Sequence, residues 1–564
     1  MSGAFDAIVV GSGMSGGWAA KELCERGLKT LVLERGRHVE HGPDYTDHQA
    51  PWEIENRGRV PEAEIAEHYA VQSKCYAFTT ANKHFWVRDD EHPYETPEDK
   101  PFVWIRGYHL GGRSLLWARH SYRLSEMDFE ANLRDGHGVD WPIRYADMAP
   151  WYDHVERFAG ISGETAGLPQ LPDGIYQPPM DLNAVEKDFK ARIEARWPSR
   201  RFMMGRVAHL TRPTDEQTEL GRGQCQYRDH CYRGCSFGAY FSSLSATLPA
   251  AERTGNLTVV TGAAVDGLDH DPSTGRVTGV RVIDMNSREH RTYHGRVVFL
   301  CASAINSAQI LLNSTSEANP NGLANRSDQV GRNLMDHISG MGAVADVPGF
   351  EDRYYAGRRP AGIYMPRYRN VTEPDRDFVR GYGFQGGASR QTWARGSHTP
   401  GVGAELKADL NRPGGWVMSI GAFGEMLPNP DNRVTLTGRR DRWGAPIPRI
   451  ACAYGENDLK LAARAQTDAL EMLRAAGYAN VRPRRDTVLA PGYGIHEMGT
   501  ARMGRDPSTS VLNGWARAHD VPNLFVTDGS FMTSSACQNP SLTYMAMSAR
   551  AANHAADLLS QGAI

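Results

Sequence analysis

The first 34 residues contain the pattern that most constrains the fold of this chain. Two short apolar runs, Phe5–Val10 (FDAIVV) and Thr30–Glu34 (TLVLE), have the composition of buried parallel strands. Between them lie the glycine-rich turn GSGMSG and the segment Trp18–Arg26, in which apolar residues recur at helical spacing. Strand, glycine turn, helix and strand in this order predict a βαβ unit of the kind that binds dinucleotides.

Each glycine of the turn has a separate role in that prediction. Gly11 permits the tight turn, Gly13 lets backbone N–H groups approach a pyrophosphate, and Gly16 allows the helix to pack closely on the strand. The N-terminus of the helix favours the negative charge of the phosphates. Glu34, at the end of the second strand, is placed to accept hydrogen bonds from an adenosine ribose.

Composition and charge exclude several classes of protein. The 564 residues, of which 40% are hydrophobic and 23% charged, predict a globular protein of about two domains. The formal net charge is only −3, and no basic stripe indicates a nucleic-acid partner. The most apolar stretch, Val297–Leu312, is short for a membrane span and contains several polar residues. The start of the chain has no export-signal pattern. We therefore expect no nucleic-acid partner and no direct membrane span.

The order of the predicted elements indicates an α/β (α+β) chain in which one domain interrupts another. Strand-like segments at Leu257–Val260, Val297–Leu300 and Asn523–Thr527 would join the N-terminal unit in a Rossmann-like sheet. The block from Ala345 to Val488 contains further strand-like segments and one strong helix, Leu459–Ala476. We expect a discontinuous dinucleotide-binding domain and an inserted substrate domain with an antiparallel sheet. Their approximate bounds are 1–40, 101–125, 220–340 and 490–564 for the first, and 126–219 and 341–489 for the second, with 41–100 as an excursion or lid.

The C-terminal segment distinguishes a flavin from a nicotinamide dinucleotide. The predicted strand Asn523–Thr527 ends in Asp528-Gly529, far along the chain from the N-terminal unit. A flavin protein needs such a second element for the ribityl-phosphate end of its cofactor, with Asp528 as a hydrogen-bond acceptor. A helix beginning near Pro540 would direct free N–H groups at the flavin pyrimidine ring, where its positive end stabilises the charge of reduced flavin. These features favour FAD over a nicotinamide cofactor.

Several further segments resemble the glucose–methanol–choline (GMC) oxidoreductases. They follow the family order over nearly the whole chain: Leu110–Ser114 (LGGRS), Leu300–Ser307 (LCASAINS), Val330–His337 (VGRNLMDH) and His496–Ser548. The resemblance implies a Rossmann-like FAD-binding domain with an inserted substrate domain, the GMC fold. Two positions depart from it. Arg113 follows the glycine pair where many members have a small residue, and Leu116 stands where one branch has a histidine bonded to the flavin, so we expect non-covalent FAD.

The resemblance also implies catalytic and cofactor-binding residues. His496, in GIHEMG, is expected to be the catalytic base, with Asn539, in QNPSLT, as its partner. A neutral imidazole suits removal of a hydroxyl proton near neutral pH, and an uncharged amide can hold the hydroxyl oxygen. We expect His337 and His519 to be structural. Besides the residues named above, the expected cofactor-binding set comprises Ser15, Arg35, Gly112, Ser114, Trp117, Val265, Gly529, Ser541 and Leu542.

Three of the eight cysteines, Cys225, Cys231 and Cys235, crowd into eleven residues. Three thiolates on one loop can wrap a metal centre, and zinc with His230, a [3Fe–4S] cluster and free thiols are the alternatives. Adjacent His230 and Cys231 would be awkward ligands of one ion, whereas three cysteines without a fourth suit [3Fe–4S]. The spacing resembles that of the iron–sulfur-bearing catalytic subunits of bacterial FAD-dependent sugar dehydrogenases, so we expect a [3Fe–4S] cluster at these cysteines.

Within that branch, residues 104–125 and 136–156 resemble the catalytic subunits of glucoside 3-dehydrogenases. This implies oxidation of the C3 hydroxyl of glucosides and disaccharides. Trp104, Trp117 and Tyr122 would either stack on a pyranose ring or pack in the core. The alternatives are a dehydrogenase of free glucose, a sugar alcohol or gluconate, and a flavin electron-transfer protein without turnover. Because a one-electron cluster beside a flavin implies relay to a redox partner, we expect a dehydrogenase rather than an oxidase.

The same branch implies partners and a compartment. We expect a sugar or glucoside substrate, a small accessory subunit and a cytochrome c as electron acceptor. Related catalytic subunits often leave the cytoplasm bound to a small partner that bears the export signal. We therefore expect a periplasmic location reached in this way, with cytoplasmic residence as the alternative.

Overall fold

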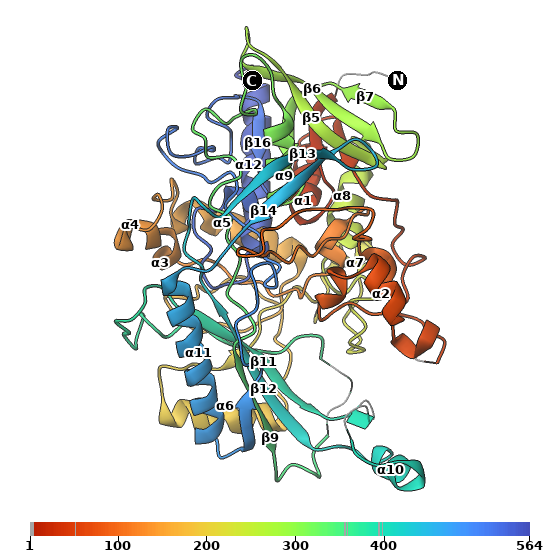
Figure 1. Cartoon of the computed structure of the whole chain (residues 1–564), viewed down its shortest axis with the longest axis vertical. Helices are drawn as coiled ribbons and strands as arrows, with labels where there is room; N and C mark the ends of the chain where they lie inside the picture. Colours follow the sequence, from red (N-terminus) through yellow and green to blue (C-terminus); the bar gives the residue numbers. More distant parts are fainter. Residues whose placement is uncertain (1–4, 51, 355–356, 358, 393–394, 397–398) are drawn as a thin grey trace.

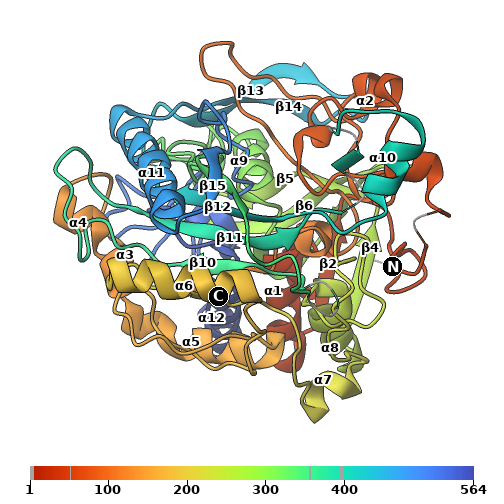
Figure 2. The ribbon, with the colours of Figure 1, turned by 90° about the horizontal axis from the view of Figure 1, so that it is seen from below.

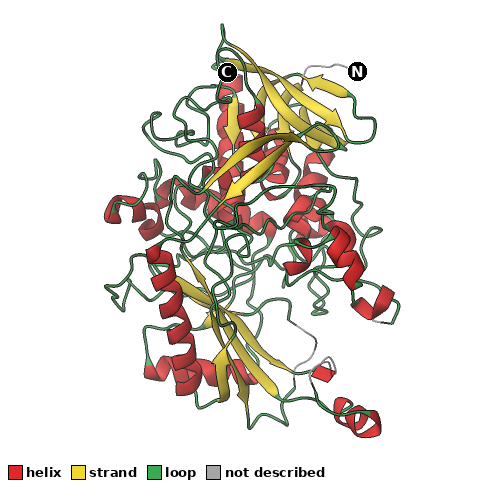
Figure 3. Cartoon of the chain, viewed as in Figure 1, coloured by secondary structure: helices red, strands yellow, loops and turns green. Residues whose placement is uncertain are grey.

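Two sheets dominate the computed structural model, which describes residues 5–564 except 51, 355–356, 358, 393–394 and 397–398. A parallel sheet with its helices occupies the upper half of Figure 1, and an antiparallel sheet with two long helices occupies the lower half. Long loops run through the region between the two sheets, as Figure 3 shows. The predicted mixed α/β class with an added antiparallel sheet is confirmed.

The parallel sheet carries the predicted βαβ unit. Its strand order is β16 (Leu524–Val526), β8 (Gly295–Leu300), β1 (Phe5–Val10), β2 (Thr30–Glu34) and β4 (Leu257–Thr261). Neighbouring strands are parallel throughout. Ala7 and Val9 pack on one face of the sheet, while Ile8 and Val10 pack on the other. The apolar runs are therefore continuous because the sheet is covered on both faces.

Helices cover both faces of the parallel sheet. On one face, α1 (Met14–Glu25) packs against α12 (Ser541–Ser560), so the two ends of the chain share one core. Two further helices extend this layer, since α8 (Leu248–Arg253) packs on α1 and α5 (Tyr145–Ala159) packs on α12. On the other face lies α9 (Ala304–Asn313), which follows β8 directly.

The antiparallel sheet has six strands and one buried face. Its strand order is β15 (Ala479–Pro483), β9 (Gly342–Val347), β12 (Trp416–Gly424), β11 (Tyr382–Arg390), β10 (Ile363–Met365) and β3 (Met203–Met204). One face packs on α6 (Ala184–Arg196) and α11 (Glu456–Ala475), through side chains such as Phe384 and Ile420. Figure 2 shows this end of the molecule from below. Gln385 and Phe423, at alternating positions, line a cavity.

Smaller elements complete the fold. One additional sheet contains β5 (Ala263–Asp271), β6 (Arg276–Asp284) and β7 (His290–Tyr293), and another contains β13 (Arg433–Arg440) and β14 (Pro446–Ala451). The short helices are α2 (Glu62–His68), α3 (Glu126–Phe129), α4 (Ala131–Asp135), α7 (Asp215–Glu219) and α10 (Gly403–Leu410). Among the described residues, no helix combines the length and the apolar character that crossing a membrane requires.

The strands follow the predicted division of the chain, although the exact domain bounds stay a prediction. Every strand of the parallel sheet comes from a segment assigned to the FAD-binding domain, and every strand of the six-stranded sheet comes from one assigned to the substrate domain. Two segments assigned to the substrate domain, α5 and β13–β14, instead add side chains such as Tyr152 and Val434 to the core of the parallel-sheet half. Within 41–100, the Asp47 carboxylate accepts hydrogen bonds from Ser236, beside the cysteine segment.

Gly16→Ala tests the close packing at the glycine turn. A Cβ at Gly16 would lie 1.9 Å from the carbonyl oxygen of Gly11, so the turn would have to open. Overpacking of this kind costs about 1–3 kcal/mol. We expect the purified variant to unfold at a lower temperature and to retain less bound flavin. At Gly415 a Cβ meets nothing within 4 Å, so Gly415→Ala is the matched control. Unchanged flavin content in Gly16→Ala would contradict this account.

Candidate active site

A cavity of about 820 Å³ collects residues from both halves of the molecule. Such a volume lies at the upper end of the range for ligand sites. The structure brings to this cavity nearly all of the residues that the sequence predicted. They are Gly11, Gly13, Ser15, Glu34, Arg35, Gly112, Ser114, Trp117, Val265, His496, Asp528, Gly529, Asn539 and Ser541.

Two predicted cofactor residues do not line the cavity. Gly16 lies directly beneath the turn, against the backbone of Gly11. Leu542 is fully buried in the core of the parallel-sheet half. Both therefore support the shape of the site and make no direct contribution to its surface.

The glycine turn is held in place by the carboxylate of Glu34. One carboxylate oxygen accepts hydrogen bonds from the backbone and side chain of Ser12, and the other accepts one from the N–H of Gly36, at 2.8 Å. Burial raises the pKa of Glu34, and these hydrogen bonds oppose that effect. The predicted contact of Glu34 with a ribose stays a prediction. What the structure adds is that the same carboxylate ties the end of β2 to the turn.

A second glycine segment approaches the turn from the opposite side. A Cβ at Gly112 would lie 3.4 Å from the Cα of Gly13, so the two backbones come close at this point. Ser114 contributes its hydroxyl, which donates to the carbonyl of Gly111 and accepts from the N–H of Ser243. The two glycine segments together form a narrow passage with exposed backbone groups, which suits a pyrophosphate.

The C-terminal elements meet the cavity as the sequence predicted. Asp528 is buried, and its carboxylate accepts hydrogen bonds from Ser307 and Ser530. Helix α12 begins at Ser541 with Pro540 at the N-cap and no side-chain cap, and Ser541 lines the cavity. The first N–H groups of α12 are therefore available to a ligand, and the positive end of its dipole favours negative charge there.

The cavity also contains a buried cation. Arg106 is 4% exposed, and its Nε and Nη2 have no hydrogen-bond partner among the described residues. It forms an ion pair with Asp89, 3.6 Å from Nη2, and its guanidinium lies over the ring of Trp104. Its N–H groups can therefore still donate hydrogen bonds to an anionic ligand. A large cavity with a glycine passage, a free helix N-terminus and a buried arginine with N–H groups to donate fits FAD.

His496 lies on a loop that one carboxylate organises. The two oxygens of Asp336 accept hydrogen bonds from the backbone N–H groups of Gly492, Gly494 and His496, at 2.7, 2.8 and 3.0 Å. Asp336 is fully buried, and this burial, followed by the nearby Glu497, raises its pKa to about 6. The segment around Asp336 matches a family motif in the sequence, but its role as the anchor of the loop that carries His496 is visible only in these contacts.

The imidazole of His496 contacts two side chains. Its Nε2 lies 3.3 Å from Nδ2 of Asn539, the predicted partner, and its Nδ1 lies 2.9 Å from Nδ1 of His337. The two side chains predicted as the catalytic pair therefore lie together at the cavity wall. His337, which the sequence analysis treated as structural, is in direct contact with His496. A further residue, Gln385 on β11, donates a hydrogen bond to Oδ1 of Asn539.

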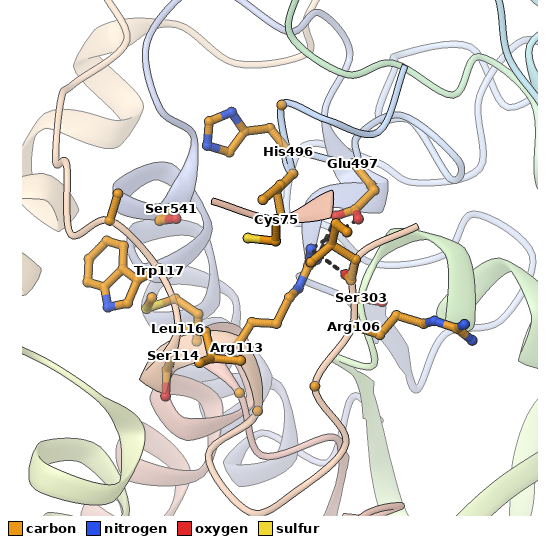
Figure 4. A pocket seen from close by; sticks show the side chains of 18 of the residues that line it. Cys75, Arg106, Arg113, Ser114, Leu116, Trp117, Ser303, His496, Glu497 and Ser541 are labelled. Carbon is orange, nitrogen blue, oxygen red and sulfur yellow. Dashed lines mark hydrogen bonds and ion pairs between the residues drawn. The ribbon is translucent and has the colours of Figure 1, made fainter. Parts of the chain in front are cut away.

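Arg113, the departure from the family pattern, forms an ion pair next to the catalytic loop. Its Nη1 and Nη2 donate to the two oxygens of Glu497, at 3.0 and 2.6 Å. In Figure 4 the side chain of Arg113 extends from beside Ser114 toward the carboxylate of Glu497, to the lower right of His496. Glu497 is 3% exposed, so the pair is largely protected from water. The larger side chain at position 113 is therefore accommodated by a carboxylate on the loop that carries His496.

The aromatic residues predicted near the pocket divide between the two expected roles. Trp104 and Trp117 line the cavity, and the indole N–H of Trp117 donates to the carbonyl of Phe241. Tyr122 is fully buried and stacks on Tyr364, with ring centroids 3.9 Å apart, so it is a core residue. His120, which the sequence analysis did not single out, lines the cavity and contacts the hydroxyl of Tyr122.

The three clustered cysteines share a second, small cavity. Cys225, Cys231 and Cys235 all line it, with Cys231 3.6 Å from Nε2 of His209. As the side chains are placed, the cavity measures about 20 Å³, room for about one water. The described part of the chain contains no group of three or more His, Cys, Asp or Glu side chains positioned to hold a metal ion. The predicted gathering of the cysteines is present, whereas a cluster is not shown.

His230, the alternative zinc ligand, has a different environment. Its Nδ1 lies 3.0 Å from the backbone carbonyl of Asp47, in the segment 41–100 that covers this loop. It lines the same small cavity as the cysteines. The cysteine cavity is therefore lined by three thiols and the imidazoles of His209 and His230, with Arg228 and Asp229 as charged neighbours.

Comparisons with known proteins agree with these observations. Two family models described as GMC oxidoreductase match residues 5–339 and 428–548. A 2-methyl-1,2-propanediol dehydrogenase of Mycolicibacterium austroafricanum is 30% identical over 97% of this chain and 94% of its own length. The fructose dehydrogenase large subunit of Gluconobacter japonicus is 27% identical over 99% of this chain and 98% of its own. The crystal structure of pyridoxine 4-oxidase from Mesorbium loti shares the fold, with a TM-score of 0.57, 17% identity and coverage of 97% and 98%.

We expect the pKa of His496 to lie below the ordinary histidine value of 6.5, so that its imidazole is a neutral base at neutral pH. Burial is the largest cause that lowers its pKa, and His337 and Arg113 add to it. A group with a lowered pKa is protonated only when the pH falls through that lower value, so its base form is complete at pH 6.5 and above. We expect the rate of flavin reduction by substrate to show no loss between about pH 8 and pH 6.5 from this group.

Stopped-flow measurements of flavin reduction across this range test the expectation. The variant Arg113→Leu removes one cation that lowers the pKa, so any loss of rate should move to higher pH. A wild-type profile that falls with a midpoint near 6.5 would show that His496 titrates as an unperturbed histidine.

Proposed function

Because the chain belongs to the GMC oxidoreductase family, we propose that it is an FAD-dependent sugar dehydrogenase that oxidises a hydroxyl of a glucoside or disaccharide, at C3, to a ketone. The family acts on alcohol and sugar CH–OH groups and implies FAD as the cofactor. The observation that carries the proposal is the pairing of His496 with Asn539 at the wall of the FAD-shaped cavity.

The residues of the chain divide the reaction among them. The amide of Asn539 holds the hydroxyl oxygen of the substrate, which places the hydroxyl proton at Nε2 of His496. The neutral imidazole takes that proton, while FAD supplies the acceptor for the hydride from the carbinol carbon. The N-terminus of helix α12 opens on the cavity and would stabilise negative charge on a reduced flavin bound there, and the Arg113–Glu497 pair holds the loop that carries His496.

Polar side chains from the antiparallel-sheet half of the cavity support a polyol as substrate. Arg359 donates to the carboxylate of Glu186, at 2.6 and 2.9 Å, and both residues line the cavity with Gln385 and Ser339. The hydroxyl of Ser339 is buried without a hydrogen-bond partner among the described residues. A substrate with several hydroxyls matches such a wall better than a simple alcohol does. The choice of C3 rests on the resemblance of residues 104–125 and 136–156 to glucoside 3-dehydrogenases.

Anaerobic mixing of the FAD-loaded protein with a panel of substrates tests this function. We expect glucosides and disaccharides to bleach the flavin absorbance and to yield a 3-keto product identifiable by NMR. His496→Ala should slow bleaching by about 10²-fold to 10⁴-fold, and His519→Ala is the control, because His519 lies outside the cavity and bonds to Ser510. Bleaching by free glucose, a sugar alcohol or gluconate alone would overturn the substrate assignment, and no bleaching by any alcohol would overturn the function.

A second proposal concerns the exit of the electrons. We infer that Cys225, Cys231 and Cys235 bind a [3Fe–4S] cluster, and that an external one-electron acceptor is reduced instead of O2. The support is a cation: Arg119 is fully buried, its Nε and Nη2 lack hydrogen-bond partners among the described residues, and its charge interacts with Cys231. Arg119 lies over the rings of Tyr232 and Tyr240, and thiolates on a cluster would add negative charge beside this cation. Binding requires the thiols to turn toward one centre.

Anaerobic purification with iron and sulfide analysis tests this proposal. We expect about three irons and four sulfides for each chain and an electron paramagnetic resonance signal of an oxidised [3Fe–4S] cluster. Cys231→Ser should abolish the signal while the flavin is retained. Cys452→Ser is the control, because Cys452 is buried in the main core and is far from the three cysteines in the sequence. Zinc in place of iron, or rapid peroxide formation from sugar and oxygen, would contradict the proposal.

The partners and the compartment extend these proposals. One relative is a large subunit by name, which supports a small accessory subunit for this chain as well. We propose a cytochrome c as the acceptor and a periplasmic location reached with an exported partner. Fractionation of cells with and without a co-expressed partner subunit tests the location.

A further inference from the structure

Proton positions on His337 are determined by its surroundings. Nε2 of His337 lies 3.2 Å from the backbone carbonyl oxygen of Ser535, which can only accept a hydrogen bond. Nε2 therefore carries a proton. His337 is fully buried, and this burial lowers its pKa to about 4, so the ring is neutral. A neutral imidazole has one N–H, so Nδ1 of His337 is left as an acceptor.

Because Nδ1 of His337 accepts a hydrogen bond, it determines which nitrogen of His496 carries the proton. The two Nδ1 atoms are 2.9 Å apart, so one must donate and the other accept. Since Nδ1 of His337 is the acceptor, Nδ1 of His496 carries the proton. Nε2 of a neutral His496 is then unprotonated, and it is the atom that faces Asn539 and the cavity.

The hydrogen bonds on the Asn539 side of His496 run in the same direction as those on the His337 side. The amide nitrogen of Gln385 donates to Oδ1 of Asn539. This contact fixes the amide of Asn539 with its nitrogen toward His496, where it lies 3.3 Å from Nε2. This contact between Asn539 and His496 is longer than the other hydrogen bonds of the series, and a long hydrogen bond is a weak one. It is therefore the contact that a substrate hydroxyl can replace.

We propose that His337 and Gln385 are positioning residues that fix His496 as the tautomer with a free Nε2. Five groups form one directional chain: Gln385 donates to Asn539, Asn539 to His496, His496 to His337, and His337 to the carbonyl of Ser535. Hydrogen bonds that run in one direction strengthen one another. The inference rests on the proposed function in one respect: alcohol oxidation requires a base at the atom that faces the substrate.

This series of hydrogen bonds predicts which substitutions of His337 are tolerated. Glutamine carries an amide oxygen that can accept from Nδ1–H of His496 and an amide nitrogen that can donate to Ser535. Leucine has a similar volume and offers neither group. We expect His337→Leu to slow flavin reduction about 10²-fold or more, as loss of the correct tautomer does in other histidine bases, while His337→Gln stays within about tenfold of the wild type.

Three measurements separate this role from a structural one. Flavin content and melting temperature establish that each variant is folded and loaded. Substrate titration should show the loss in the limiting rate of flavin reduction rather than in substrate affinity. In protein labelled with ¹⁵N-histidine, the His496 resonances, assigned by difference from His496→Ala, should report a protonated Nδ1 in the wild type and a mixture of tautomers in His337→Leu.

The outcomes of the test are distinct. His337→Leu with a wild-type limiting rate, or His337→Gln as slow as His337→Leu, would overturn the proposal. A wild-type spectrum with the proton on Nε2 of His496 would overturn it as well, without any activity measurement. If no alcohol reduces the wild-type flavin, the proposed function fails, yet the ¹⁵N spectra still decide the tautomer. His519→Leu is the matched control, because His519 is hydrogen-bonded but lies outside the cavity.

Discussion

The carboxylate of Asp336 is the constraint on which the active site depends. It accepts three backbone N–H groups from the loop 492–496, and so determines the path of the segment that carries His496. A Cβ at Gly494 would lie 2.4 Å from Oδ1 of Asp336, so the loop can approach the carboxylate only with glycine there. Because His337 follows Asp336 directly, one short segment holds both the backbone of the catalytic loop and the ring of its histidine.

Both halves of the molecule contribute side chains to the site, so neither half contains the complete site. His496 and Asn539 belong to the C-terminal part of the parallel-sheet half, whereas Gln385 comes from strand β11 of the antiparallel sheet. Alternation along β11 places Phe384 in the core between the sheet and its helices and Gln385 in the cavity. A slip of one residue in the register of β11 would therefore remove the amide that orients Asn539.

Two buried arginines line the large cavity. Arg106 and Arg119 both have guanidinium nitrogens without hydrogen-bond partners among the described residues, although Arg106 forms an ion pair with Asp89. By contrast, Arg113 has a bidentate carboxylate partner in Glu497. Buried cations with N–H groups left to donate are expected where anionic groups bind. This pattern favours an anionic ligand such as a pyrophosphate in the large cavity.

The sequence alone predicted the parallel sheet, the glycine turn and the motifs whose residues, His496 and Asn539 among them, meet at the cavity, because these features depend on local spacing and on motifs read along the chain. It could not reveal the partners of that pair. His337 and Gln385 lie 159 and 154 residues away from the side chains that they contact, so nothing local marked either one. Arg113 and Glu497 are 384 residues apart, and the chain alone showed only an unusual residue after a glycine pair. Tertiary folding decided these contacts, since proton positions and ion pairs depend on which atoms meet in space.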